Sequence, residues 1–263
     1  MLLAFDLDNT LVTEDNRLSA ATARAVQAAR RAGHHISVLT GRTQASAQPF
    51  LELLEVDSYY SVNHGALVVG EQGEQLHRAM LSAPEVHALI ARYQGYSGVE
   101  YACIVDETLY VGNPDDPRWQ WVHTQNHFLE PFSPDTVRQA DKVVFSCGLQ
   151  GQRIHDDICV HFPHLVRYLW RDNFLEIAAA DAHKAAALAR LCRVLGYSPA
   201  DTIAFGDGIN DVTMIAWAGY GVAVSDLAHP DVLAVADEHI AAPEQEGVSR
   251  WLHQHLLPKA SAA

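Results

Sequence analysis

Two carboxylates, Asp6 and Asp8, follow directly after a short apolar run at the start of the chain. Residues 2–5 are all apolar, which is typical of a strand buried on both faces in a parallel sheet. Open α/β sheets bind their ligands at the carboxyl ends of such strands. Two anions placed together there are unfavourable unless a positive group, such as a bound cation, joins them. The spacing therefore predicts a metal-assisted reaction that uses carboxylate chemistry.

Further polar side chains follow other predicted strands, and one lysine occupies the start of a predicted helix. Lys184 is one of only three lysines in the chain and occupies the third position of a helix that Asp181 can cap. The polar residues at the other strand ends are Thr40, Asp207, Asn210 and Asp211. Because the strand ends of a parallel sheet meet at one edge, these groups can converge. Carboxylates suit a hard cation, whereas a hydroxyl, an ammonium and a helix N-terminus suit an anion, so the set predicts phosphoryl transfer.

Strands and helices alternate around these groups. The pattern predicts a helix over residues 19–32, a strand over 36–39, a helix over 43–54, a strand over 59–62 and a hairpin turning at 71–73. The same rhythm returns after Asp181, with a helix to residue 195 and strands over 202–205 and 221–224. This order is typical of βαβ units. The sequence therefore predicts a doubly wound, parallel, Rossmann-like α/β core.

The character of the chain changes at Ser82, which forms a capping box with Glu85 and opens a new helix. From there to residue 178 aromatic residues are frequent. Strand-like runs over 99–105, 108–111, 142–146 and 165–170 alternate with helical stretches over 117–127 and 150–161. A block of roughly 95 residues with this mixture is typical of a small α+β domain. We therefore expect residues 1–80 and 179–263 to form the core and residues 81–178 to form an inserted α+β cap, or lid.

Composition excludes several function classes. The formal net charge of −14 argues against a nucleic-acid partner, which needs a basic face. No apolar run approaches the ~18 residues of a membrane-spanning helix, and the apolar start lacks the basic flank of a signal peptide. The four cysteines contain no Cys-x-x-Cys pair, which favours reduced, buried thiols. We expect a cytoplasmic protein without a nucleic-acid or membrane partner, and the sequence leaves its oligomeric state open.

Four motifs, in order along the chain, give it a resemblance to a known family. They are DLDNTLV at residues 6–12, LTGR at 39–42, the lysine at 184, and GDGINDVTM at 206–214. With them the sequence resembles the phosphatases of the haloacid dehalogenase superfamily, and most closely their Cof-like sugar-phosphatase branch. The long insertion between the threonine and lysine motifs resembles the family's type IIB cap, which closes over the substrate.

This resemblance implies the chemistry of the two aspartates. Asp6 is expected to attack phosphorus and to become a transient aspartyl phosphate. Asp8 is expected to protonate the leaving alcohol and then to activate the hydrolytic water. The implied cofactor is Mg²⁺, with Mn²⁺ as an alternative because both accept oxygen ligands. The expected ligands are the Asp6 carboxylate, the Asp8 backbone carbonyl, Asp207, and Asp211 either directly or one layer further out.

The same resemblance implies how the phosphoryl group is held. Thr40 and Lys184 are expected to bind its oxygens, and they count with the aspartates as catalytic. The full substrate-binding set is expected to be Thr40, Gly41, Arg42, Lys184 and Asn210. The expected substrate is a small phosphorylated metabolite, with a sugar phosphate favoured.

The motifs depart from the family pattern at several places. Asn9 and Ala185 each replace a more usual glycine, and residues 224–226 read Val-Ser-Asp where the Cof-like branch has Gly-Asn-Ala. Residues 63–66 read Asn-His-Gly-Ala, which is similar to the His-Gly-Ala of trehalose-phosphate phosphatases. The Val-Ser-Asp departure weakens the assignment to the branch and not to the superfamily, whereas the Asn-His-Gly-Ala segment slightly favours a sugar phosphate.

Other functions remain open from the sequence. A phosphomutase or a glycosyl-phosphoglycerate phosphatase would also use Asp8, so that residue does not separate them from a simple phosphatase. A non-catalytic phosphosugar-binding module on the same fold would need neither Asp6 nor Asp8. His123 and His127 have the i, i+4 spacing of a zinc site, but no third ligand is evident. We therefore expect these two histidines to be exposed or packed against aromatic side chains.

Overall fold

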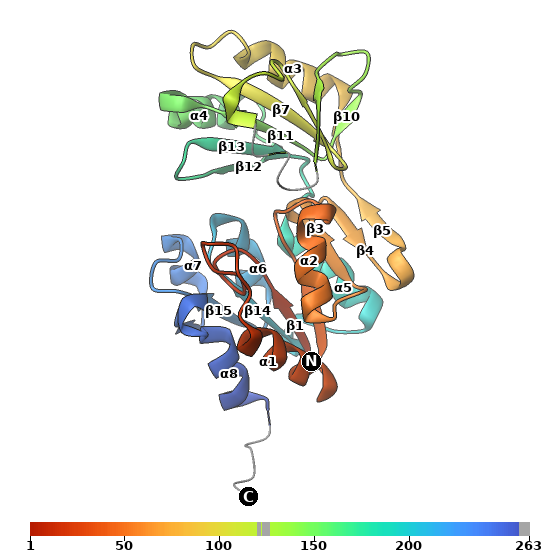
Figure 1. Ribbon diagram of the computed structural model, residues 1–263, viewed down its shortest axis with the longest axis vertical. Helices are drawn as coiled ribbons and strands as arrows, with labels where there is room; N and C mark the ends of the chain where they lie inside the picture. The colour runs from red at the N-terminus through yellow and green to blue at the C-terminus, as the bar shows by residue number, and fades with distance from the viewer. Residues whose placement is uncertain (120–121, 123–126, 258–263) are drawn as a thin grey trace, which may run out of the picture. The chain divides into compact units, whose positions relative to one another are not determined.

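A computed structural model of the chain describes residues 1–119, 122 and 127–257. The chain divides into two compact units, and each is described by itself (Figure 1). Unit 1 consists of Met1–Gly41, Ala47–His77 and His183–Ala263, and unit 2 consists of Arg42–Ser46 and Arg78–Ala182. The assignment of residues 81–178 as a lid and of the remainder as the catalytic core stays a prediction.

Unit 1 is built on a five-stranded sheet in the order β16-β15-β14-β1-β2. Its strands are β1 (Leu2–Phe5), β2 (His35–Val38), β14 (Thr202–Gly206), β15 (Tyr220–Val224) and β16 (Glu238–Ile240). Every neighbouring pair is parallel. The predicted parallel α/β fold is therefore confirmed, and all five carboxyl ends emerge at one edge.

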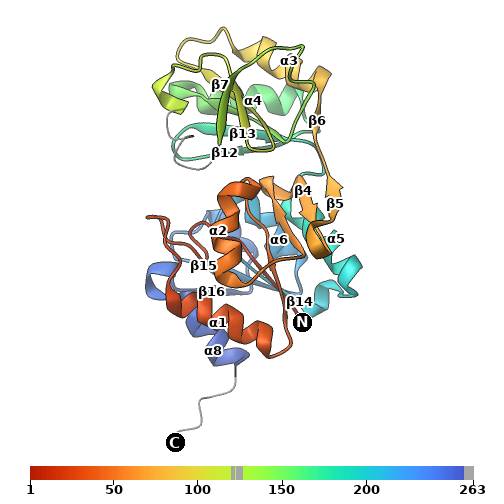
Figure 2. The same ribbon diagram turned by 45° about the vertical axis from the view of Figure 1, so that its right-hand side comes forward.

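Alternate side chains of β1 face opposite layers of helices. Leu3 and Phe5 belong to an apolar cluster that includes buried residues of helices α1, α2 and α8. Leu2 and Ala4 instead pack with residues of helices α5 and α6. The helices of unit 1 are α1 (Ala20–Arg31), α2 (Gln44–Leu54), α5 (Lys184–Leu195), α6 (Val212–Trp217), α7 (Pro230–Val235) and α8 (Gly247–His255). Figure 2 shows α1 and α8 side by side, and this pair is in contact. The sheet is thus buried on both faces, as its uninterrupted apolar strands require.

A second, three-stranded sheet in the order β3-β4-β5 follows α2 along the chain. Its strands are β3 (Tyr60–Val62), β4 (Leu67–Val69) and β5 (Gln75–Arg78). Two tight turns of the same kind connect them, Asn63–Gly65 and Glu71–Gly73. In each turn the middle residue, His64 or Gln72, has a left-handed backbone conformation. The predicted hairpin turning at residues 71–73 is confirmed.

Unit 2 contains a six-stranded sheet in the order β12-β13-β11-β7-β8-β9. The strands are β7 (Glu100–Val105), β8 (Thr108–Val111), β9 (Phe128–Pro131), β11 (Lys142–Ser146), β12 (Val166–Leu169) and β13 (Phe174–Ala178). Residues of α3 (Ala83–Tyr93) and α4 (Gly151–His161) pack on one face, and Trp119 belongs to the cluster on the other. Two short strands, β6 (Leu81–Ser82) and β10 (Gln139–Ala140), form a separate pair. This is the α+β mixture expected of the inserted block.

Two predicted elements differ from the structure or lie outside it. The helix that carries Lys184 begins at that residue and is capped by His183, whose Nδ1 accepts a hydrogen bond from Ala186 N at 3.2 Å. The predicted cap, Asp181, lies instead in a turn closed by the bond from Ala182 N to Ala179 O, so the helix can begin only after that turn. The helix predicted over 117–127 falls largely outside the described residues. None of the described helices has both the length and the apolar character needed to span a membrane.

Candidate active site

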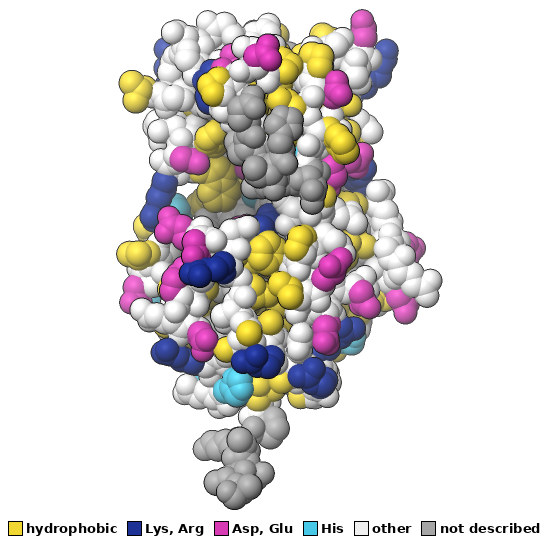
Figure 3. Space-filling view, viewed as in Figure 1, with side chains coloured by type: hydrophobic (Ala, Val, Ile, Leu, Met, Phe, Trp, Pro, Cys, Tyr) yellow, Lys and Arg dark blue, Asp and Glu magenta, His cyan; other side chains and the backbone are white. Residues whose placement is uncertain are grey.

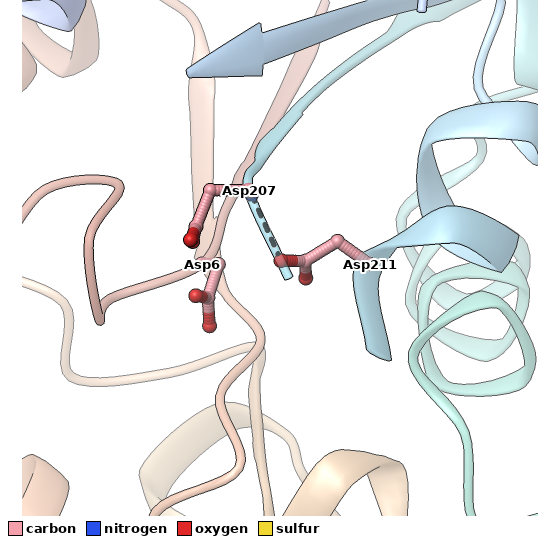
Figure 4. Close-up of side chains that lie close together, drawn as sticks. All are labelled: Asp6, Asp207 and Asp211. Carbon is pink, nitrogen blue, oxygen red and sulfur yellow. Dashed lines mark hydrogen bonds between the residues drawn. The ribbon is translucent and has the colours of Figure 1, made fainter. Parts of the chain in front are cut away.

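Three carboxylates converge at the carboxyl edge of the parallel sheet (Figure 4). Asp6 follows β1 and Asp207 follows β14, and these two strands are neighbours with Phe5 opposite Phe205. The backbone of Asp6 continues the ladder, because its N–H donates to Phe205 O at 3.0 Å. Asp211 ends the short turn that precedes α6. One ligand oxygen from each of the three side chains lies within 4.8 Å of the other two. This is close enough for the carboxylates to share one cation.

A buried lysine joins two of these carboxylates. The Nζ atom of Lys184 lies 2.5 Å from Asp6 Oδ1 and 2.6 Å from Asp211 Oδ1. The lysine has no exposed surface, and only 4% of Asp6 is exposed. Burial alone would lower the pKa of the lysine, but the charges of Asp211 and Asp6 outweigh it and raise the pKa above its ordinary value. The ammonium is therefore a fixed positive charge at the end of the sheet.

Asp211 organises the loop that carries Asp207. Its Oδ2 accepts hydrogen bonds from the backbone N–H groups of Asp207, at 3.1 Å, and Gly208, at 2.9 Å, while its Oδ1 contacts Lys184. Gly206 makes room for this carboxylate, since a Cβ there would lie 2.5 Å from Asp211 Cγ. Both oxygens of Asp211 are thus engaged within the protein, and they hold the loop and the lysine in fixed positions.

Burial, together with the concentration of negative charge, raises the pKa of two of the carboxyls. Burial, and then the nearby charge of Asp211, raises the pKa of Asp207 to about 7. Burial also raises the pKa of Asp6 well above its ordinary value, although the lysine opposes this. Such carboxylates favour a bound cation, because a cation stabilises their charged form. Hard oxygen donors are the ligands that Mg²⁺ prefers, so the donor set fits that ion.

The threonine and asparagine predicted to bind phosphate are buried at the same edge. Thr40 is fully buried, and its backbone N–H donates to Ser61 O at 3.0 Å. Asn210 is 6% exposed and directs its Nδ2 to Nδ1 of His64, 3.1 Å away. The backbone N–H of His64 in turn donates to Thr40 O at 2.9 Å. The residues that follow β2, β3 and β14 are therefore connected by hydrogen bonds.

Other predicted residues are not members of the group of three carboxylates. The side chain of Asp8 is half-buried and is not a member of the group, although the ligand expected from this residue was its backbone carbonyl. Arg42 belongs to unit 2, where its Nη1 lies 3.5 Å from Ser46 O. The histidine pair considered for zinc gives no metal group among the described residues, because His123 lies outside them and His127 contacts the Thr43 hydroxyl at 2.9 Å.

The structure adds one residue to the site that was not singled out from the sequence. The hydroxyl of Thr10 is fully buried and donates to Asp207 Oδ1 at 3.2 Å. The signal that could have identified it is its position inside the DLDNT motif, four residues after Asp6. A hydrogen bond to a candidate metal ligand fixes the orientation of that ligand, so Thr10 belongs with the site.

Known proteins are similar to this chain in sequence and in fold. Residues 3–252 match the haloacid dehalogenase-like hydrolase family. An HMP-PP phosphatase of Cronobacter sakazakii is 26% identical, with 88% of this chain and 86% of that protein covered. The pyridoxal phosphate phosphatase YbhA of Escherichia coli is 25% identical, with 97% and 98% covered. A solved HAD subclass IIB sugar phosphatase is 24% identical and superposes with a TM-score of 0.83, with 96% and 98% covered.

Proposed function

We propose a specific activity for this chain, which belongs to the haloacid dehalogenase-like hydrolase family and is a phosphatase of its Cof-like branch. The proposed activity is the Mg²⁺-dependent hydrolysis of a small sugar phosphate. One observation carries the proposal, the buried cluster of Asp6, Lys184 and Asp211 beside Asp207. A binding module would gain nothing from a buried nucleophile held against an ammonium. Phosphoryl transfer needs that arrangement, because the nucleophile and the electrostatic groups must be fixed before the reaction.

In the proposed reaction Asp6 is the nucleophile. One oxygen of the Asp6 carboxylate forms the bond to phosphorus while the bond from phosphorus to the substrate oxygen breaks, and the other oxygen stays with Lys184 and the proposed cation. Asp8 gives its proton to the leaving oxygen, which departs as an alcohol. Asp8 then takes a proton from water as the water oxygen attacks phosphorus, and the Asp6 carboxylate is regenerated together with inorganic phosphate. Thr40, Gly41, Lys184 and Asn210 are proposed to hold the phosphoryl oxygens, with Arg42 also predicted to contact the substrate.

The proposed ligands of Mg²⁺ are the carboxylates of Asp6 and Asp207 and the backbone carbonyl of Asp8. We propose that Asp211 lies one layer further from the ion, because both of its oxygens already bind Lys184 and the backbone of the Asp207 loop. When bound, Mg²⁺ neutralises the clustered carboxylates and withdraws charge from the phosphoryl oxygens. The protein's own contribution is to keep Asp6, Asp207 and Lys184 in place.

The substrate class is supported by the names of the relatives and by charge. The two curated relatives described above are named for small phosphorylated compounds. On the face drawn in Figure 3, Lys and Arg side chains of the described residues lie scattered among Asp and Glu and form no continuous basic stripe. With a net charge of −14, this favours a small substrate over a nucleic acid. A cytoplasmic location and the absence of a membrane partner remain part of the proposal.

The experiment that tests the proposal measures phosphate release from a panel of sugar phosphates, nucleotides and cofactor phosphates, with Mg²⁺ and with chelator. We expect release from at least one sugar phosphate, and we expect the chelator to abolish it. Substrate loss with little free phosphate would identify a phosphomutase instead. Tight binding without any turnover would identify a phosphosugar-binding module, and release only from a glycosyl phosphoglycerate would identify that alternative phosphatase.

The raised pKa of Asp207 makes metal binding depend on pH. Its folded pKa of about 7 lies above the ordinary value of 3.8, so the metal-free protein favours the protonated carboxyl and loses stability as pH rises through this interval. A metal ligand must be deprotonated, and Mg²⁺ therefore competes with a proton below about pH 7. We expect the rise in Tm caused by Mg²⁺ to be much larger at about pH 8 than at about pH 5.5. Equal shifts at the two pH values, each measured against a chelated sample, would contradict this.

Thr10 offers a test of the metal site that leaves every proposed ligand intact. Replacing Thr10 with Val keeps the shape but removes the hydrogen bond to Asp207 Oδ1. We expect Mg²⁺ affinity, measured by titration of metal-dependent turnover and of the Tm, to fall roughly tenfold or more. Thr10→Ser should recover most of the loss, because it restores a hydroxyl. If Val and Ser variants bind the metal equally well, Thr10 does not orient Asp207.

A further inference from the structure

His64 adopts a backbone conformation that few residues tolerate. It is the middle residue of the Asn63–Gly65 turn, with φ of 59° and ψ of 15°. Asn63 and Gly65 on either side also have positive φ, at 50° and 108°. Positive φ is uncommon outside glycine, although Asn and His adopt it more readily than most residues. Gly65 approaches α5 closely, since a Cβ there would lie 2.6 Å from His183 O. The turn is thus seated against the start of the helix that carries Lys184.

The imidazole ring of His64 packs directly on the segment that follows β2. Its exposed fraction is 2%. A Cβ added to Gly41 would lie 2.3 Å from Cε1, 2.8 Å from Nδ1 and 2.9 Å from Nε2 of the ring. The nitrogen-bearing edge of the ring therefore occupies the space beside the Gly41 backbone. Together with the bond from His64 N to Thr40 O, this fixes His64 to two consecutive residues of the proposed phosphate-binding set.

The other contact of the ring is with Asn210, on the segment that follows β14. Asn210 Nδ2 lies 3.1 Å from His64 Nδ1. An amide NH₂ group only donates, so Nδ1 accepts and the neutral ring carries its proton on Nε2. A neutral imidazole can therefore connect the segment after β2 with the segment after β14. Its Nδ1 accepts from Asn210, and its Cε1 edge lies toward Gly41.

We propose that His64 is a positioning residue that braces the Thr40–Gly41 segment against Asn210 and so sets the spacing of the groups that bind the phosphoryl oxygens. The inference deepens the proposed function and rests on it. The rigid ring connects these segments because it contacts both of them directly. Small displacements of phosphate-binding groups strongly reduce the rate of phosphoryl transfer, so the contacts of His64 are expected to affect that rate.

The test compares three variants, each made at a residue with a left-handed backbone conformation. His64→Ala removes the ring, whereas His64→Asn keeps a hydrogen-bond acceptor and a residue type that tolerates positive φ. Gln72→Ala is the matched control, because Gln72 occupies the same position in the second turn, with φ of 56°, and is exposed. We expect His64→Ala to lower kcat/KM roughly tenfold to a hundredfold. We expect Asn to recover part of this loss and Gln72→Ala to change only stability.

Binding of inorganic phosphate, measured by calorimetry in Mg²⁺ buffer, separates this inference from the proposed function. We expect His64→Ala to weaken phosphate binding about fivefold, as the loss of one hydrogen bond would. We also expect the double variant with Asn210→Ala to bind no more weakly than the weaker single variant, since the two residues act as a pair. If the wild type binds phosphate but turns over nothing, the proposed function fails while these measurements still test the brace. Unchanged phosphate affinity in His64→Ala, or additive effects in the double variant, would overturn the inference.

Discussion

Asp6→Asn is expected to reduce phosphate release by about a thousandfold or more, because the amide has no carboxylate oxygen to attack phosphorus. The substitution keeps the size and shape of the side chain. It also removes one of the buried charges that repel one another, since Asp207, Asp211 and Asp8 all act to raise the pKa of Asp6. We therefore expect the metal-free variant to be at least as stable as the wild type. Turnover and the free energy of unfolding should thus change independently.

Asp57→Asn is the matched control for this change. Its carboxylate is exposed and lies 3.6 Å from Arg30, and Asp57 is not a member of any motif of the site. It should retain full turnover and Tm. Residual activity of Asp6→Asn within tenfold of the wild type would rule out Asp6 as the nucleophile, provided that mass spectrometry shows the asparagine has not reverted to aspartate by deamidation.

Lys184→Met is expected to destabilise the protein and to abolish turnover. Removing the ammonium leaves Asp6 and Asp211 buried without their positive partner, and breaking a buried ion pair in this way lowers the free energy of unfolding by about 3–5 kcal/mol. The raised pKa of Lys184 means that its contribution is complete below its ordinary value of 10.5 and is lost only as pH rises through the higher folded value. Between about pH 5 and pH 8 the wild-type lysine thus stays charged, so Lys184 itself adds no pH dependence to the stability in this interval.

The loss of stability in Lys184→Met should be larger at about pH 8 than at about pH 5, because the variant can protonate its buried carboxyls only at low pH. Urea unfolding at the two pH values measures this. Lys142→Met is the matched control, since Lys142 is also buried and pairs with Glu176 at 2.8 Å, but between β11 and β13 of unit 2. We expect that variant to lose stability and to keep its affinity for inorganic phosphate. A stable Lys184→Met protein at both pH values would refute the electrostatic account.

Much of the fold follows from local patterns. The apolar run of β1 predicts a strand buried on both faces, and the structure buries all four of its residues. The Ser82 and Glu85 capping box predicts the start of α3, and both of its hydrogen bonds are present. Two strands of the six-stranded sheet in unit 2 escaped prediction for physical reasons. β9 contains Pro131, which is tolerated because β9 is an edge strand, and β13 contains Glu176, which is half-buried only because Lys142 pairs with it.

The contacts of the candidate site are harder to predict from local sequence patterns than the fold is. That Asp6 and Asp207 would meet could be inferred, because both follow apolar strands of a parallel sheet. The bond between His64 and Asn210 joins residues 146 positions apart in the chain, and it depends on a left-handed turn that propensities do not foresee. The start of α5 was misplaced for a similar reason, because His183 is an unusual cap and Asp181 a common one. The sequence predicts the helices and strands better than it predicts which side chains, far apart along the chain, contact each other.

The pairing of β1 with β14 determines when the central sheet can be completed during synthesis of the chain. Leu2 lies opposite His35 on one side and Thr202 on the other, so the second partner of the first strand is added 200 residues after Leu2. At about 5–20 residues per second, this delay is on the order of ten seconds or more. Residues 78–182 leave the ribosome within that interval, before β14 exists. A translation product that stops ahead of Lys184 would hold Asp6 and Asp8 without the ammonium or Asp207, and so would lack two groups of the proposed active site.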